Sequence, residues 1–455
     1  MKKIIIGLIG AFSLTGCHIY KNYERPAEVV VSDSLFRLPF SSDDTTSVAS
    51  LSWKEFFTDP YLQRLIDTAI CNNTDLQIAA LKIKEAEATL TSSKLSFLPY
   101  FTFDPQGNIS RFDGGSTQKS YALNVSAGWD IDLFGKLRNA KKNAETVLFQ
   151  NQASSQAVHA ELVATVAGSY YTLLMLDKQL EISKRTVENW GDYIRVLKAL
   201  KKNSTVNEVA IAQAEADKIK VESSLLTIEQ QILSVENSLS AILGKKSGVI
   251  ERGKLDEQRF LSDISVGVPL QLLRNRPDIR LAEWQLAQAY YVTNEARAAF
   301  YPSVTLGGTV GWTNSGGGVI VNPGGWVLTT VGNLVQSLFN RGENIARLKI
   351  SKAQQEEALL YFKQSILDAG VEVNDALTQW QTARKRLELD EKQIDALSSA
   401  LKNTTLLMKY GTTNYLEVLV AQQSLLQSEL TMVEDRFNEI QGVISLYNAL
   451  GGGVF

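Results

Sequence analysis

The sequence contains few of the residues that carry catalysis or hold metal ions. It has two cysteines and two histidines among 455 residues, too few for a disulfide framework, a zinc pattern or a histidine-based acid–base site. His159 is therefore expected on a solvated helix face. No phosphate-binding loop, nucleophile elbow or cluster of histidines with acids occurs in the sequence. We accordingly expect no metal, no cofactor and no enzyme activity.

Positive charge and long apolar runs are scarce as well. The net charge is −3, whereas binding to nucleic acid would require a basic face. Beyond the N-terminus, no apolar run reaches the roughly 20 residues of a membrane-spanning helix. Hydrophobic residues make up 44% and charged residues 21% of the chain, which is normal for a folded protein. The net charge therefore argues against a nucleic-acid-binding protein, and the lack of long apolar runs argues against a membrane-spanning helix beyond the N-terminus.

The N-terminus resembles the signal of a bacterial lipoprotein. Two lysines precede a short apolar segment at 4–14, which suits a signal peptide rather than a membrane span. Leu-Thr-Gly-Cys at 14–17 resembles a lipobox, whose cysteine is lipidated and becomes the mature N-terminus. We therefore expect a signal peptide at 1–16 and a lipid on Cys17, which leaves Cys71 as a buried, unpaired residue. An ordinary secretory signal with a chance cysteine is the alternative.

A long apolar seam dominates the C-terminal part of the chain. Within the segment 343–408, an apolar residue recurs at every seventh position from 359 to 408, and the position three residues later is mostly small or apolar, with Asp390 an exception. This spacing predicts a helix on the order of 100 Å long, packed along its length against neighbouring helices. The seam residues are Leu359, Ile366, Val373, Trp380, Leu387, Ile394, Leu401 and Met408.

The same seam occurs earlier in the chain, which indicates an internal duplication. One constant offset places the seam of 134–200 on that of 343–408, and also places LSAILG at 239–244 on LYNALG at 446–451. We therefore predict two copies of a unit of about 200 residues. The copies span 59–250 and 251–455, after a lipid-anchored tether at 17–58. The earlier seam consists of Val166, Leu173, Leu180, Val187 and Ile194.

Each copy also contains a predicted β-hairpin. Apolar and polar residues alternate between 121 and 133, as in a strand with one apolar face. Hairpins at 100–133 and 303–338 give four strands, long enough for the 9–11 residues that cross a bilayer. A soluble sheet packed on helices is the alternative. The candidate membrane-interface aromatics are Tyr121, Trp129, Trp312 and Trp326.

Four strands are too few to cross a membrane alone. They cannot close into a barrel, and an open sheet edge cannot lie in lipid. Three chains would together provide about twelve strands, within the range of known barrels.

After its β-hairpin each copy returns to helix. Turn residues near 202–207 and 410–414 divide the helical hairpins at 134–243 and 340–450.

Several motifs resemble those of the TolC-like outer membrane efflux factors, in their lipoprotein (OprM/NodT-like) branch. They are RPDIRLAE at 276–283, AAFYPSV at 298–304, DLFGK at 132–136 and GTTNYLEVLVAQ at 411–422. The resemblance implies a mainly α fold with a small β part. It also implies a homotrimer, with a twelve-stranded transmembrane β-barrel and an α-barrel built from the helical hairpins. A periplasmic adaptor protein and an inner-membrane pump would dock at the hairpin tips.

The same resemblance implies a periplasmic gate at the start of the last long helix. Leu416 matches the apolar constriction of the family, Glu417 matches its first acid, and Val420 stands where a second acid is usual. Three copies of Glu417 would attract cations, and valine in place of the second acid suggests a more apolar throat. Glu208 is the counterpart in the first copy. An ordinary first-turn glutamate, favoured by the helix dipole, is the alternative for Glu417.

The hairpin tips are the expected adaptor contacts, although turn chemistry alone would explain the same residues. The tip residues are Ser204, Thr205, Gly411 and Thr412.

The sequence therefore predicts the outer membrane duct of a tripartite exporter of small molecules or drugs, lipid-anchored and extending into the periplasm. The exit duct of a type I protein secretion system is an alternative from the same family. A lipid-anchored coiled-coil structural or adhesive protein is an alternative from another class. That alternative predicts neither the lipid-suited strands nor their duplication.

Overall fold

The computed structural model describes residues 20–26, 52–111, 113–202, 206–259, 276–316, 319–410 and 413–452. The predicted lipid site Cys17 and all four predicted tip residues lie outside these residues. The chain divides into two compact units, and each draws on both sequence copies. We call Met1–Val29, Leu81–Ala153 and Arg280–Gln364 the strand unit, and Val30–Ala80, Ser154–Ile279 and Ser365–Phe455 the hairpin unit.

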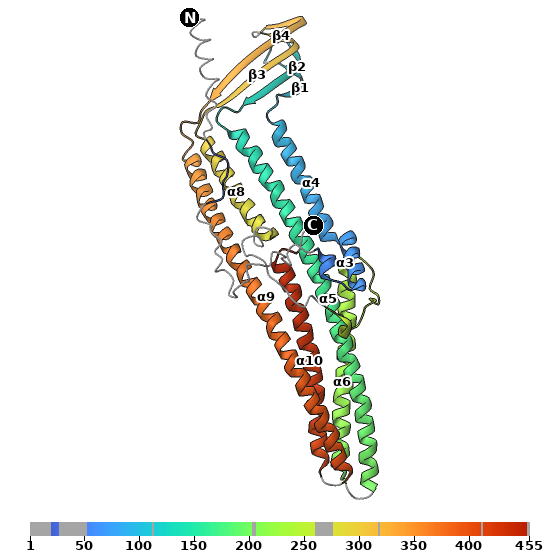
Figure 1. The fold of residues 1–455 in the computed structure, drawn as a ribbon. Helices are drawn as coiled ribbons and strands as arrows, with labels where there is room; N and C mark the ends of the chain where they lie inside the picture. Colours follow the sequence, from blue (N-terminus) through green and yellow to red (C-terminus); the bar gives the residue numbers. More distant parts are fainter. Residues whose placement is uncertain are drawn as a thin grey trace. The chain divides into compact units, whose positions relative to one another are not determined.

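The strand unit contains one four-stranded antiparallel sheet in the order β1-β2-β3-β4. The two outer strands, β1 and β4, pair on one side only within the chain (Figure 1). Among the described residues, their outer edges therefore carry backbone groups without a strand partner. The strands are β1 (Tyr100–Ser110), β2 (Gln118–Ile131), β3 (Ser303–Gly316) and β4 (Val319–Val335).

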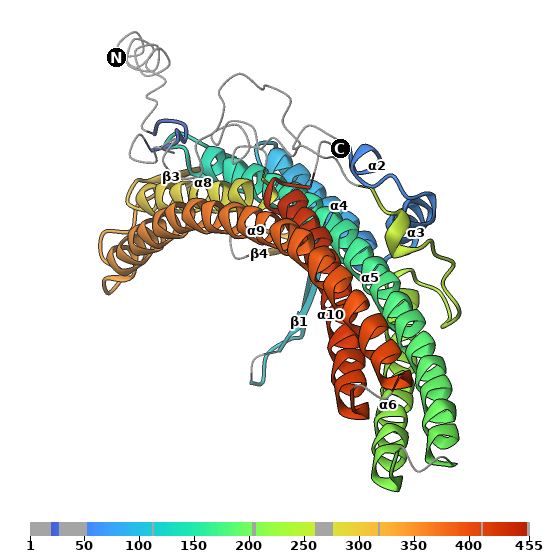
Figure 2. The same cartoon turned by 60° about the horizontal axis from the view of Figure 1, so that its bottom comes forward.

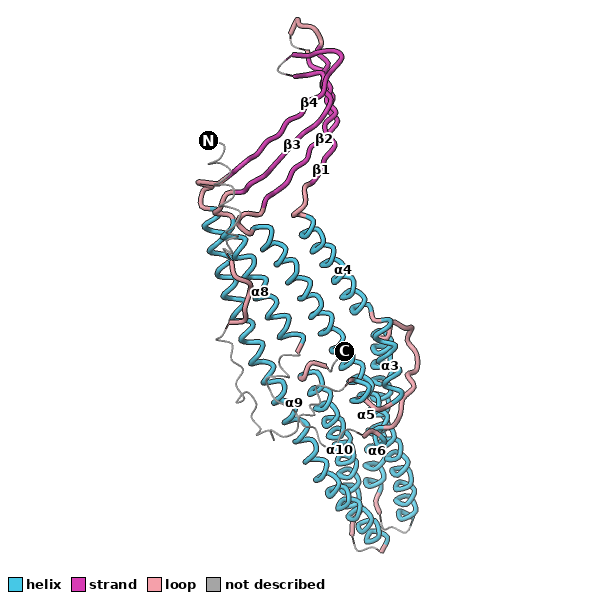
Figure 3. Tube along the Cα trace, turned by 45° about the horizontal axis from the view of Figure 1, so that its top comes forward, coloured by secondary structure: helices cyan, strands magenta, loops and turns pink. Residues whose placement is uncertain are grey.

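Helices connect to these strands at the end of the sheet opposite the β1–β2 and β3–β4 turns (Figure 3). Stacked rings hold the helices and connections of this unit together: Phe149 lies 4.6 Å from Trp284, and Phe134 lies 5.1 Å from Tyr301, between ring centroids. The helices that contribute residues here are α4 (Thr74–Leu95), α5 (Lys136–Lys202), α8 (Pro277–Ala298) and α9 (Glu343–Lys409).

The hairpin unit contains two helical hairpins, α5–α6 and α9–α10, whose helices lie side by side (Figures 1 and 2). The long helices α5 and α9 have 67 residues each, and the returning helices have 35 each. These equal lengths agree with the duplication, which itself remains an inference from sequence. The returning helices are α6 (Glu208–Ile242) and α10 (Tyr415–Ala449), and the short helices of this unit are α2 (Trp53–Phe56), α3 (Pro60–Asn72) and η3 (Leu255–Glu257).

The predicted seams form the core of the hairpin unit. Val166 and Leu173 of α5 and Val373 of α9 are fully buried, and they belong to one hydrophobic cluster. Burying such a side chain contributes about 1.5–3 kcal/mol. Together with the four strands, these buried seams confirm the predicted fold class, mainly helical with a small antiparallel sheet.

Two predictions about single residues are wrong. Cys71 is exposed, because the buried stripe of α3 runs through Leu62, Ile66 and Ala69, and a residue two positions after Ala69 lies on the opposite face. His159 is half-buried rather than solvated. It occupies the seam position seven residues before Val166, and burial lowers the pKa of its imidazole.

Candidate functional site

The returning helices α6 and α10 begin in the same way. The side chain of Asn207 accepts a hydrogen bond from the backbone N of Ala210 at 3.1 Å. Asn414 accepts from the backbone N of Leu416 at 2.9 Å and of Glu417 at 3.3 Å. These caps satisfy backbone donors at the helix start, where the dipole also favours a carboxylate. Glu208 and Glu417 lie in the first turns of these two helices. This geometry is compatible with Glu417 as an ordinary first-turn acid and also with Glu417 as a gate residue.

The three predicted gate residues of α10 share one exposed face. Leu416 is 51% and Val420 is 52% exposed, whereas Val418 and Leu419 are buried in the hairpin core. Leu416 and Val420 are about one helical turn apart, with Glu417 beside them. Two large apolar side chains and one carboxylate therefore point away from the core of their own hairpin.

The two predicted gate acids differ in their surroundings. Glu208 forms an ion pair with Lys201, which lies in the last turn of α5. Within the described part of the chain, no cation lies within ion-pair distance of Glu417. The charge of Glu208 is therefore partly compensated, and that of Glu417 is available to an ion or another chain.

Helix α6 carries an apolar seam that no other described segment of the chain covers. Ile219, Leu226 and Leu233 are spaced by seven residues and are 62%, 69% and 61% exposed. The other face of α6 packs into the hairpin core through Val221 and Ile228. A heptad seam of this kind is the usual contact surface for another helix.

The predicted interface aromatics lie at both ends of the sheet. Tyr121 and Trp312 lie toward the turns, where the Trp312 ring is 5.6 Å from that of Trp326. Trp129 lies toward the helices, and its Nε1 donates a hydrogen bond to the carbonyl of Phe97 at 2.9 Å. Eight residues separate Tyr121 from Trp129, roughly 27 Å along β2. The two groups are thus spaced as two interfacial belts would be.

The DLFGK motif forms the turn from β2 into α5. The carboxylate of Asp132 accepts hydrogen bonds from the backbone N of Leu137 at 3.2 Å and of Arg138 at 2.9 Å, and so caps the helix. Gly135 has a φ of 74°, and a Cβ there would lie 3.2 Å from the ring of Tyr20. The left-handed backbone therefore favours glycine at this position, and the ring packed on it leaves little room for a Cβ.

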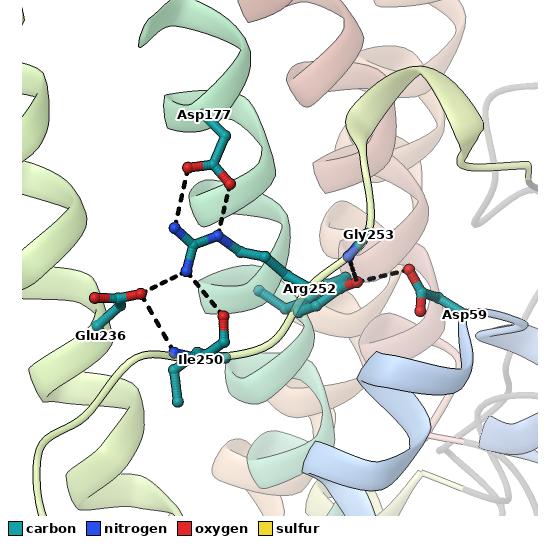
Figure 4. A network of polar contacts seen from close by, with 7 residues as sticks. Asp59, Asp177, Glu236, Ile250, Arg252 and Gly253 are labelled. Carbon is teal, nitrogen blue, oxygen red and sulfur yellow. Dashed lines mark hydrogen bonds and ion pairs between the residues drawn. The ribbon is translucent and has the colours of Figure 1, made fainter. Parts of the chain in front are cut away.

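A buried polar network fixes the segment after α6 to the hairpin unit (Figure 4). The Arg252 guanidinium binds Asp177 through Nε at 2.6 Å and Nη2 at 3.0 Å, and binds Glu236 through Nη1 at 2.5 Å. The hydrogen bonds to Asp177 raise the pKa of Arg252 against the opposing effect of burial. Every carboxylate in this network has a hydrogen-bonding partner, so the network holds the segment after α6 against α5 and α6.

The same network reaches the start of α3. The Tyr170 hydroxyl donates to Asp59 at 2.6 Å and accepts from the backbone N of Gly253 at 3.0 Å. Burial, and then the bond to Asp59, raise the pKa of Tyr170. Asp59 also caps α3 through the backbone N of Tyr61 at 2.8 Å. No periodic pattern in the sequence indicated Arg252.

The described residues offer neither a metal site nor a membrane-spanning helix. They contain no group of three or more histidine, cysteine, aspartate or glutamate side chains placed to hold a metal ion. Nor does any described helix combine the length and the apolarity that crossing a membrane requires.

Comparison with known proteins gives consistent matches over nearly the whole chain. A family model described as "Outer membrane efflux protein" matches residues 65–245 and 268–452. The chain is 29% identical over 447 residues to the cation efflux system protein CusC of Escherichia coli O6:H1, covering 97% of each chain. It is 27% identical to the probable outer membrane lipoprotein SilC of Salmonella typhimurium, covering 99% of each.

The fold is similar to that of a solved outer membrane channel. The open-state structure of the MtrE channel of Neisseria gonorrhoeae matches with a TM-score of 0.83 at 26% identity, covering 95% of this chain and 98% of that chain. The arrangement of strands and hairpins and the match of the family model over most of the sequence lead to one conclusion. The chain belongs to the outer membrane efflux protein family.

Proposed function

We propose that the chain is the outer membrane channel of a tripartite efflux system, a homotrimeric and passive duct that receives its cargo from a periplasmic adaptor and an inner-membrane pump. The observation that carries this proposal is the incompleteness of the single chain. Its sheet has two open edges, and its α6 seam has no cover.

Assembly around a common axis resolves both features. Four strands from each of three chains give about twelve, so that β1 of one chain can pair with β4 of the next. The exposed seam through Ile219, Leu226 and Leu233 can pack on a neighbouring helix in the same assembly. A lipid-anchored coiled-coil protein without a pore would account for the seam but not for the paired hairpins.

The gate lies at the start of α10. Leu416 and Val420 form an apolar constriction on its exposed face, and three copies of Glu417 place like charges near the axis. Binding of the adaptor at Ser204, Thr205, Gly411 and Thr412 shifts the hairpin tips and opens this mouth. Glu208 contributes less to the gate than Glu417, because its charge is already paired with Lys201.

The chain is anchored through an acylated Cys17 and resides in the outer membrane. One acyl chain binds a membrane only weakly, so stable anchoring depends on the two or three acyl chains that a bacterial lipoprotein carries. The duct itself supplies no energy, so the pump selects the cargo. CusC is named for cation efflux, which supports ions or small molecules as cargo rather than the proteins of a type I secretion system.

A transport assay tests this function. Cells that lack the gene for this protein should retain a fluorescent pump substrate, and the wild-type gene should restore efflux of that substrate. Leu226→Asp should not restore efflux, because a buried charge would break the seam, whereas Ser224→Asp, away from the seam, should. Unchanged dye efflux together with loss of a secreted protein from the medium would favour the secretion duct instead.

A further inference from the structure

A pocket of about 510 Å³ opens at the junction between strands and helices in the strand unit. Its walls come from the N-terminal segment 20–26, the end of α4 and the start of α5. The aromatic rings of Tyr20, Phe97 and Phe134 line it. It thus combines an apolar wall with several basic side chains.

The pocket has an excess of positive charge. Its basic lining residues are Lys21, Lys94, Arg138, Lys141 and Lys142, and no carboxylate lines it. Arg138 pairs with Asp132 at 3.2 Å, and Lys142 pairs with Glu145 at 2.8 Å, both from outside the lining. The other three, Lys21, Lys94 and Lys141, have no ion-pair partner among the described residues. Ammonium groups gathered in this way attract an anion.

The pocket lies just on the helix side of the sheet. Phe97 is three residues before the start of β1, and Phe134 is three residues after the end of β2. Trp129, an aromatic suited to a membrane interface, donates its indole hydrogen bond to the carbonyl of Phe97. Leu98 and Leu133, in the two connections, are exposed. If the strands cross the bilayer, the pocket lies at the level of the lipid headgroups.

The position of the lipid anchor points to the same level independently. Cys17 is three residues before Tyr20, so an extended chain places its Cα at most about 11 Å from that of Tyr20. Acyl chains on Cys17 enter the periplasm-facing leaflet of the outer membrane. The pocket beside Tyr20 must therefore lie close to the headgroups of that leaflet.

We infer that this pocket binds the phosphate of an anionic phospholipid of the periplasm-facing leaflet, with Lys21, Lys94 and Lys141 around the phosphate. The exposed leucines beside it meet the glycerol and acyl portion, which free phosphate lacks. The inference rests on the proposed membrane placement of the strands. Basic pockets at a membrane surface bind acidic headgroups by this chemistry.

Native mass spectrometry of the full trimer in neutral detergent, with phosphatidylglycerol or phosphatidylcholine added, tests this inference. Phosphatidylglycerol adducts should persist at collision energies that remove phosphatidylcholine. The double variant Lys94→Gln/Lys141→Gln should weaken phosphatidylglycerol binding by about tenfold or more. Lys82→Gln/Lys84→Gln, on the exposed surface of the same helix as Lys94, should leave it unchanged. Cys17→Ser should retain the adducts, because the bound lipid is not the covalent one.

Three results would overturn the inference. They are equal retention of the two lipids, unaltered binding in the double variant, and displacement of phosphatidylglycerol by millimolar inorganic phosphate, which would indicate a free-phosphate site. Trimer mass and pore conductance are measured on the same samples. A conducting trimer without lipid selectivity therefore contradicts the pocket alone, whereas loss of trimer and conductance in the wild type contradicts the proposed function.

Discussion

Asp390 of α9 and Asp435 of α10 place two buried carboxyl groups against each other inside the second helical hairpin. They are 8% and 2% exposed, and Arg386 Nε lies 2.9 Å from Asp435 Oδ2. Burial, the hydrogen bond to Asp435 and its charge raise the pKa of Asp390, and Arg386 partly opposes them. The offset that places Val166 on Val373 puts Ser183 and Ile228 at these positions in the first copy. Only the second hairpin thus carries this titratable contact.

This pair predicts a dependence of stability on pH. The folded state holds the proton of Asp390 at pH values where the unfolded chain, with an ordinary aspartate pKa of about 3.9, has lost it. The stability contribution is therefore greatest below that pKa and decreases as the pH rises through the raised pKa. Asp390→Asn cannot ionise, so it should raise the melting temperature more at pH 7.5 than at pH 5.

The control for this experiment is Asp395→Asn, which changes an exposed carboxylate of the same helix. It should shift the melting temperature little at either pH. An Asp390→Asn effect that is equal at both pH values, or destabilising at pH 7.5, would contradict the raised pKa of Asp390.

Replacing two helical glycines with alanine should change the stability in opposite directions, because only one of them lies at the close crossing of α9 and α10. A Cβ at Gly442 would lie 2.8 Å from the backbone N of Trp380, whereas at Gly168 it would lie 3.6 Å from Nε2 of Gln441. Gly442→Ala should therefore destabilise the protein by about 1–3 kcal/mol through overpacking. Gly168→Ala should stabilise it by roughly 0.5–1 kcal/mol through helix propensity. Thermal unfolding followed by circular dichroism would show this, and stabilisation by both changes would refute the crossing.

The exposed face of α10 predicts the conductance of gate variants. Replacing Leu416 and Glu417 together with alanine removes the constriction and the ring of charge, so single-channel conductance in planar bilayers should rise. Val420→Asp restores a second acid and should strengthen block by divalent cations. Glu391→Ala, an exposed acid of α9, should leave both properties unchanged. Conductance that does not change in the double variant would reject the gate assignment.

The Arg252 network predicts a large loss of stability for a single substitution. Arg252→Leu would leave the buried carboxylate of Glu236 without its cation, a change that costs about 3–5 kcal/mol in other proteins. Arg64→Leu removes an exposed pair with Glu251 at 3.7 Å and should cost less than about 1 kcal/mol. Denaturant titration measures both, and similar losses would show that the network is not buried in solution.

The lipid anchor is tested by labelling. Cells grown with a radioactive or clickable fatty acid should label the wild-type chain and not Cys17→Ser, because the thiol is the expected acceptor. Cys71→Ser should be labelled like the wild type. Lipid that persists on Cys17→Ser would disprove the attachment site.

The repetitive parts of this fold were predictable from sequence, because a seam repeated over many heptads and an alternation over a whole strand leave few alternatives. Trp380 shows the limit. It occupies the seam position of Leu173, and its backbone lies against Gly442, where the first copy has Val235. The seam predicts that Trp380 faces the core, but the need for glycine at 442 becomes evident only when the two helices are seen together.

The polar contacts were harder to predict. Asp390 was visible as an acid in an apolar seam, but its partner Asp435 lies on another helix at no fixed sequence distance. Arg252 lies in an aperiodic segment, and its contacts with α5 and α6 depend on how that segment folds back. Non-local contacts of this kind are set by tertiary packing and not by a local pattern.

The proposed function requires that one chain provides only a third of a pore. The mass of the purified protein in mild detergent, followed by the conductance of the same sample in a planar bilayer, tests this requirement. We expect a particle of three chains that conducts ions. A single-chain particle that forms no pore would contradict it.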